Sequence, residues 1–183
     1  MVVTGVVSSG MASLGLAGFG LLVLFPFLMA YAAACDLLTM LIPNRISLAL
    51  LAGFALIALT GSMSWVEIGY HVGAAAAVLI ATFTLFAFGI IGGGDAKLAA
   101  ATALWLGLDG LGDYLLVASI FGGALTLAIL FARSHPLPHR IARMPFALHL
   151  HDARTGVPYG IALAAAALLV LPETEIWVRA VAS

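Results

Sequence analysis

The stretch GIIGGGDAKLAAATALWLGL, residues 89–108, decides how this chain is organised. Its apolar part, residues 96–108, has thirteen residues and would form a helix about 20 Å long. The hydrocarbon core of a bilayer is about 30 Å thick, so this segment is short for a membrane crossing. Whether it crosses sets the side of the membrane on which every later loop lies.

The positively charged side chains favour a crossing. If residues 96–108 span the membrane, one side holds six of the seven Lys and Arg residues: Arg45, Lys97, Arg133, Arg140, Arg143 and Arg154. The other side then holds Arg179 alone, whereas without the crossing the split is four against three. Positive residues concentrate in cytoplasmic loops. We therefore expect both termini outside and the loops 36–45, 92–95 and 133–156 in the cytoplasm.

The composition predicts an integral membrane protein. Of the 183 residues 64% are hydrophobic and 8% are charged, and the mean hydropathy is +1.20. Soluble domains carry about 25% charged residues, so lipid must solvate most of this exterior. We expect an all-α, polytopic protein with about six transmembrane helices in one membrane-embedded domain, residues 1–183, without a separate soluble domain. The expected spans are residues 16–35, 46–63, 70–91, 96–108, 114–132 and 157–171.

Charge and cysteine content exclude several other classes. The formal net charge of −1 gives no electrostatic footprint for nucleic acid. A single cysteine, Cys35, provides neither a disulfide framework nor a cysteine-based zinc site. The opening MVVTGVVSSG has no Lys or Arg, so we do not expect a cleavable signal peptide there.

Two aspartates stand at the ends of apolar segments. Asp36 ends the first segment, in CDLLTMLIPNRIS, and Asp95 opens the fourth. Carboxylates at membrane depth are costly and usually functional. Two of them at one depth can share a proton, so that one activates water while the other polarises a carbonyl group, without a metal or cofactor. Two ordinary roles stay open: Asp95 as a helix cap, and Asp36 as an interfacial partner of Arg45.

The glycines before Asp95 point the same way. Gly92, Gly93 and Gly94 permit backbone shapes and close approaches that other residues forbid. A substrate backbone would be able to come near the carboxylate there, although a plain loop between helices has the same composition.

Four motifs in order resemble those of the type IV prepilin peptidases. Asp36 followed by Ile42-Pro43-Asn44 resembles the first catalytic motif, and Gly92-Gly93-Gly94-Asp95-Ala96-Lys97 matches the GxGD motif. The segments ALWLG, residues 103–107, and VPYG, residues 157–160, complete the order. The small size resembles the short peptidases of tight-adherence (Flp) pilus systems.

The resemblance implies an aspartic endopeptidase in the cytoplasmic membrane of a bacterium or archaeon. Asp36 and Asp95 would be its catalytic residues, and prepilins and pseudopilins embedded in the lipid bilayer would be its substrates. Larger members also N-methylate their product and carry a cytoplasmic domain with paired CxxC motifs ahead of the first catalytic Asp. With 35 residues before Asp36 and one cysteine, this chain is expected to cleave without methylating.

Four further residues are candidates for shaping the site. Lys97 would tune the two aspartates or bind a substrate carboxylate, or simply extend to the interface. Pro43 and Asn44 belong to the first motif, and Pro43 sets the entry to the second helix. Tyr159 would donate a hydrogen bond toward the site, although interfacial tyrosines are common.

Three other functions fit parts of the pattern. A small transporter or channel component would use the two aspartates for protons or ions. A presenilin or signal-peptide-peptidase type enzyme shares GxGD chemistry, but that group pairs it with YD and PAL motifs, and here Cys35 precedes Asp36. An inactive pilus-assembly subunit would keep the fold alone.

Overall fold

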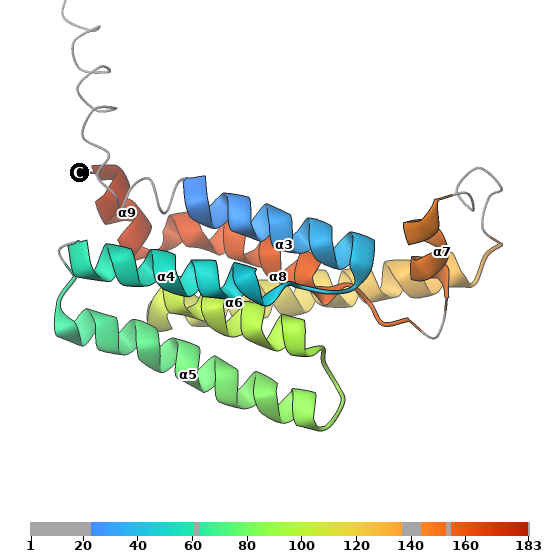
Figure 1. Cartoon of the computed structure of the whole chain (residues 1–183), viewed down its shortest axis with the longest axis horizontal. Coiled ribbons are helices and arrows are strands. Elements are labelled where there is room, and N and C mark those ends of the chain that lie inside the picture. Colours follow the sequence, from blue (N-terminus) through green and yellow to red (C-terminus); the bar gives the residue numbers. More distant parts are fainter. Residues whose placement is uncertain (1–22, 61–62, 137–143, 153–154, 183) are drawn as a thin grey trace, which may run out of the picture.

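The computed structural model describes residues 23–60, 63–136, 144–152 and 155–182, and all regular structure in these ranges is helical, as predicted. The elements in chain order are α3 (Phe25–Thr39), α4 (Asn44–Thr60), α5 (Trp65–Ala87), α6 (Gly93–Arg133), α7 (Pro145–His151), α8 (Tyr159–Val170), the 3-10 turn η3 (Leu171–Glu173) and α9 (Glu175–Ala182). Figure 1 shows α3, α4, α5, α6 and α8 lying side by side along the long axis.

Local sequence accounts for several helix boundaries. Ser64 caps α5 through a capping box, in which its hydroxyl accepts from the Glu67 N–H and the Glu67 carboxylate accepts from the Ser64 N–H. Pro26 lies in the first turn of α3, where its missing N–H costs nothing. The third helix thus covers residues 65–87 rather than the predicted 70–91, and the second begins at Asn44 rather than at residue 46.

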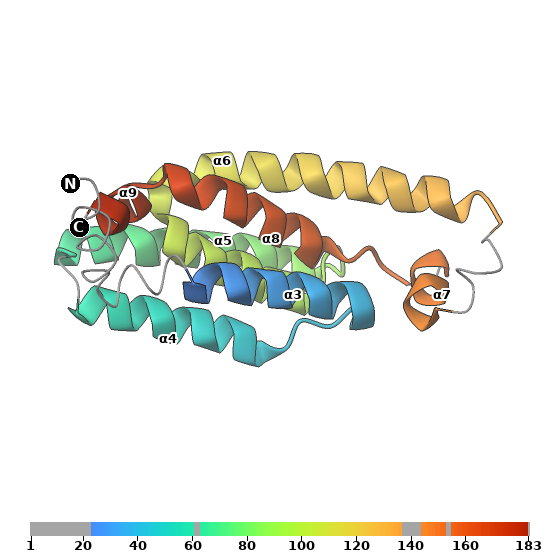
Figure 2. The same ribbon diagram turned by 90° about the horizontal axis from the view of Figure 1, so that it is seen from above.

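The element α6 combines the predicted fourth and fifth segments. All of residues 93–133 are helical except Gly107, which has φ 70° and ψ −172°. Figures 1 and 2 show the chain reversing there, so that the two halves of α6 run in opposite directions. The reversal brings Tyr114 beside Thr102. The predicted spans 96–108 and 114–132 left residues 109–113 as a connection between helices, which is wrong, because a single glycine makes the turn and Asp109 and Asp113 lie exposed on a helix.

Two contacts with neighbouring helices stabilise the break at Gly107, one made by a side chain of α5 and one by a side chain of α6 itself. The His71 ring of α5 lies against Gly107 and shares a 2.8 Å hydrogen bond, through Nδ1, with the Leu104 carbonyl. That carbonyl stands one turn before the break and would otherwise lose its helical partner. On the other side, the buried Trp105 donates from Nε1 to the Leu50 carbonyl of α4 at 3.0 Å.

The core surrounds the first half of α6. Residues 98–106 of this half are all buried, and they are rich in alanine. Around them α6 packs on α5, α8 and α4, while α3 packs on α8. Phe25 of α3 meets the Trp105 ring at 5.1 Å between centroids. The short, apolar fourth segment is therefore the centre of the bundle.

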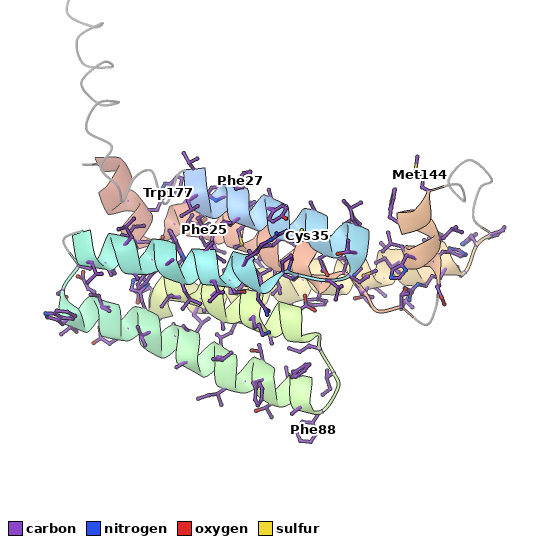
Figure 3. The ribbon with its side chains drawn as sticks, in the orientation of Figure 1. Phe25, Phe27, Cys35, Phe88, Met144 and Trp177 are labelled. Atoms are coloured by element: carbon purple, nitrogen blue, oxygen red, sulfur yellow. The ribbon has the colours of Figure 1, made fainter. Side chains whose placement is uncertain are left out.

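The outer surface of the bundle is apolar. Large side chains such as those of Phe27 and Phe88 are 65% and 76% exposed and project away from the helices (Figure 3). Two helices, α5 and α6, are long and apolar enough to cross a membrane, and the apolar α3, α4 and α8 are shorter. Residues 16–22 of the first predicted span lie outside the described residues. The chain is thus an integral membrane protein in its composition and its surface.

Two helices were not predicted, α7 and α9. The helix α7 lies within the segment 133–156, which was expected to be a loop. Arg133, at the end of α6, holds this region by donating to the carbonyls of Leu150 (2.8 Å) and Gly156 (3.0 Å). Arg140, Arg143 and Arg154, on which the predicted charge asymmetry partly rests, lie outside the described residues.

Candidate active site

The site lies where several helix ends meet. Figure 1 shows the ends of α3 and α5 and the starts of α4, α6 and α8 at the same end of the bundle. Asp36 stands in the last turn of α3, and Asp95 stands in the first turn of α6.

Asp36 is held by the start of α8. Its side chain is 5% exposed, and its Oδ2 accepts a 2.7 Å hydrogen bond from the backbone N–H of Gly160. The first N–H groups of a helix have no hydrogen-bond partner within that helix, so α8 donates this N–H to Asp36 without losing one of its own backbone hydrogen bonds. The carboxylate is thereby oriented by backbone rather than by a mobile side chain.

Asp95 reaches back to the backbone at the start of its own helix. One carboxylate oxygen, Oδ2, lies against Gly92, where a Cβ would be 3.0 Å away. The other oxygen, Oδ1, is buried and receives no hydrogen bond from the described residues. A buried carboxylate oxygen without a donor is uncommon, and it leaves Asp95 able to accept from, or donate to, another group.

Ile42 brings the two aspartates together. It lies in the short loop between α3 and α4, and its side chain packs against both Gly94 and Gly160, the neighbours of Asp95 and of Asp36. A Cβ on Gly94 would lie 3.1 Å from Ile42 Cβ, and one on Gly160 would lie 2.7 Å from Ile42 Cδ1. This arrangement brings the two carboxyl groups near enough for each to feel the charge of the other.

The other predicted residues divide into two groups. Lys97 and Asn44 meet, since Lys97 Nζ donates to Asn44 Oδ1 at 2.9 Å, and both are exposed. Pro43 leads into α4, and its carbonyl accepts from the Ile46 N–H. Tyr159 does not reach the aspartates, because its ring packs onto Gly122 in the second half of α6.

Asp36 is not the interfacial partner of Arg45, which was the alternative role considered for it. Arg45 donates to the Tyr31 hydroxyl at 2.6 Å, and its guanidinium lies over the same ring, 5.7 Å from the centroid. Asp36 therefore takes its hydrogen bond from backbone and not from Arg45.

Comparison with known proteins places this arrangement in a family. A model of the type IV leader peptidase family matches residues 23–127, which include both aspartates. The chain belongs to this family. A protein of the family from Aeromonas hydrophila, named prepilin leader peptidase/N-methyltransferase, is 34% identical over 122 residues, which cover 63% of this chain and 40% of that protein. One of the same name from Dickeya chrysanthemi is 37% identical over 129 residues, covering 67% and 44%.

The chain spans less than half the length of these relatives. No solved structure matches it. The positions of the motif residues in space therefore come from the structure described above.

Sequence reasoning missed two contributors to the site. Gly160 belongs to the VPYG segment, but that segment drew attention to Tyr159, and a backbone donor leaves no signature beyond its place at a helix start. Ile42 belongs to the first motif, and its packing role depends on glycines more than fifty residues away in either case. Only a juxtaposition in space identifies either residue.

Proposed function

We propose that this chain is an intramembrane aspartic endopeptidase that removes the leader peptide from type IV prepilins of the Flp kind and from related pseudopilins. The observation that carries the proposal is the position of Asp36 and Asp95 around Ile42, the first oriented by a backbone N–H and the second with a buried carboxylate oxygen that receives no hydrogen bond from the described residues. The names of the relatives support a prepilin as substrate.

The geometry favours distinct roles for the two carboxyl groups. The Gly160 N–H favours a charged acceptor at Asp36, whereas Oδ1 of Asp95 is buried without a donor and suits a protonated oxygen, so Asp36 acts as the base and Asp95 carries the shared proton. Asp36 removes a proton from a water molecule, and the oxygen of that water attacks the scissile carbonyl carbon. At the same time Asp95 donates its proton to the carbonyl oxygen. Asp36 then passes its proton to the leaving nitrogen as the C–N bond breaks, and Asp95 recovers a proton from the tetrahedral intermediate. No metal or cofactor is needed for these steps.

The test is cleavage of a co-expressed Flp-type prepilin. Asp36→Asn and Asp95→Asn are each expected to lower cleavage by roughly 10³-fold or more, because the amide is nearly isosteric but cannot act as the base or share the proton. Asp109→Asn is the matched control, since Asp109 is exposed on α6 beyond the break and is expected to leave cleavage unchanged. Retained cleavage by either site variant, at equal protein level, would refute the dyad.

The proposed topology has six crossings: α3, α4, α5, the two halves of α6, and α8. The site end of the bundle then faces the cytoplasm, and both termini lie outside. Labelling of single cysteines at positions 9 and 134, in a Cys35→Ser background, tests it, because Ser134 follows the site end of α6. Labelling of both positions from one side of the membrane would contradict six crossings.

We further propose that the chain cleaves without N-methylating its product. Its one cysteine cannot form a cysteine-type zinc site, which takes four ligands. Mass spectrometry of pilin processed in the presence of S-adenosylmethionine decides the matter. A product heavier by one methyl group at its new N-terminus would overturn this part of the proposal.

A further inference from the structure

A long apolar groove lies beside the site. It has a volume of about 800 Å³ and is bounded by α4, α5 and the first half of α6. Along α4 it extends from Asn44 to Leu59, which corresponds to about 22 Å of helix. Both α4 and α5 pack on α6, and Figure 1 shows them diverging toward the end of the bundle that holds the aspartates.

The groove is polar at one end only. Asn44, Ser47 and Lys97 line that end, and the remaining lining is apolar apart from the Trp65 ring nitrogen at the far end. Lys97 Nζ donates to Asn44 and is exposed, and Lys97 follows Asp95 by two residues. A cation at the rim of an apolar groove favours a partner that carries a negative group where its apolar part begins.

The floor of the groove suits a helix. Ala100 and Ala101 form it on α6, and Ala75 and Ala76 line the α5 side. Small residues allow another helix backbone to approach closely within a membrane, where packing rather than water exclusion drives association. A lipid chain gains nothing particular from such a floor, although its phosphate would also satisfy Lys97.

We propose that this groove is the docking site for the apolar helix that follows the scissile bond in the substrate, with a substrate carboxylate near the start of that helix paired with Lys97. The proposal rests on the proposed peptidase function. A helix lying in the groove leads its N-terminal end to the polar rim at Lys97 and Asn44, at the end of the bundle where α6 begins. The peptide bond just before the helix then lies at the two aspartates in an extended, cleavable form.

The first experiment fills the groove without disturbing the core. Ala76 is exposed and lines the groove, whereas the adjacent Ala77 is exposed and does not. Ala76→Trp is expected to lower kcat/KM for a full-length prepilin by roughly tenfold, since binding energy remote from the scissile bond is lost. A short peptide that spans the scissile bond but lacks the apolar helix is expected to be cleaved at the wild-type rate. Ala77→Trp is expected to match the wild type on both substrates.

Unchanged prepilin cleavage by Ala76→Trp, or an equal loss on the short peptide, would overturn the proposal. A binding measurement separates its failure from failure of the proposed function. A photocrosslinking residue is placed at position 76 or 77 in full-length Asp95→Asn protein, which binds without needing to cleave. Adducts with prepilin from position 76 and not from 77 support the groove whatever the catalytic result. Adducts with lipid alone from position 76 would show that lipid occupies the groove and refute the proposal.

The charge pairing is tested by a double-mutant cycle. Lys97→Met is expected to raise the KM for prepilin about five- to tenfold, and changing the substrate carboxylate to its amide is expected to have a similar effect. If the two groups pair, the combined change is no worse than either alone. Multiplying effects would show that Lys97 and the carboxylate act independently, which would overturn the pairing.

Discussion

The first half of α6 begins and ends at glycine, and the two ends use that residue differently. At the start, Gly92 has an ordinary extended conformation, φ −73° and ψ 145°, and Gly94 leaves room for Ile42. At the end, Gly107 has φ 70° and ψ −172°, a region essentially restricted to glycine. Glycine makes room for a neighbour at the first position and permits a backbone reversal at the second.

The difference has a functional consequence. The contact at Gly94 involves Ile42, which also packs beside Asp36 through Gly160, so a change there moves the site. The reversal at Gly107 is stabilised by His71 and lies at the opposite end of the half-helix, so a change there acts on folding. Substitutions at the two glycines should therefore separate activity from stability.

The largest expected effect is that of Gly94→Val on cleavage. Its Cβ would lie 3.1 Å from Ile42 Cβ, and its two methyl groups would push Ile42 and the adjoining carboxylates apart. A displacement of about 1 Å can cost about 100-fold in rate, and we expect a loss of that order with little change in protein level. The measurement is prepilin cleavage beside Gly112→Val, a site on the same helix with open space around it. Wild-type turnover by Gly94→Val would mean that the glycine run is an ordinary loop.

The second prediction concerns the break. Gly107→Ala keeps the chain small but imposes a conformation that a residue with Cβ avoids, and the added carbon would lie 3.0 Å from the His71 ring. We expect a loss of about 1–3 kcal/mol in the free energy of unfolding, measured in detergent micelles. The cleavage rate per folded molecule is expected to stay near that of the wild type. Stability equal to that of Gly112→Ala would contradict the role assigned to the break.

Sequence reasoning anticipated the features that follow from composition and depth. Asp36 and Asp95 were predicted to lie at one level because each ends an apolar segment, and both stand at helix ends that pack around Ile42. The all-helical fold followed from the hydropathy. The glycines before Asp95 were predicted to let a substrate backbone approach the carboxylate, which stays a prediction, and the structure adds that Gly94 leaves room for the Ile42 side chain.

The features that sequence reasoning missed depend on single backbone positions. Nothing in a pattern distinguishes Gly107 as a complete turn, so residues 109–113 were predicted to connect two helices although they lie on one. Gly160 holds Asp36 through an N–H that every residue except proline possesses. Tyr159 has a recognisable hydroxyl, but its ring fits the space above Gly122 instead. The sequence predicts chemistry from side-chain types, but it does not predict the backbone geometry that positions those side chains.

The smallest expected effect comes from a glycine of a third kind. Gly123 lies in the second half of α6, is exposed, and would have nothing within 4 Å of an added Cβ. It neither makes room for a neighbour nor has a positive φ. Here glycine only adds backbone freedom to the unfolded chain, so Gly123→Ala is expected to raise the free energy of unfolding by about 0.5–1 kcal/mol. Cleavage is expected to be unchanged.

Because the substitution and the helix are the same as in Gly107→Ala, opposite signs in the two unfolding measurements would isolate the backbone conformation as the cause. A loss of stability at Gly123 similar to that at Gly107 would mean that the helix tolerates alanine poorly throughout, and the contrast between its glycines would fail.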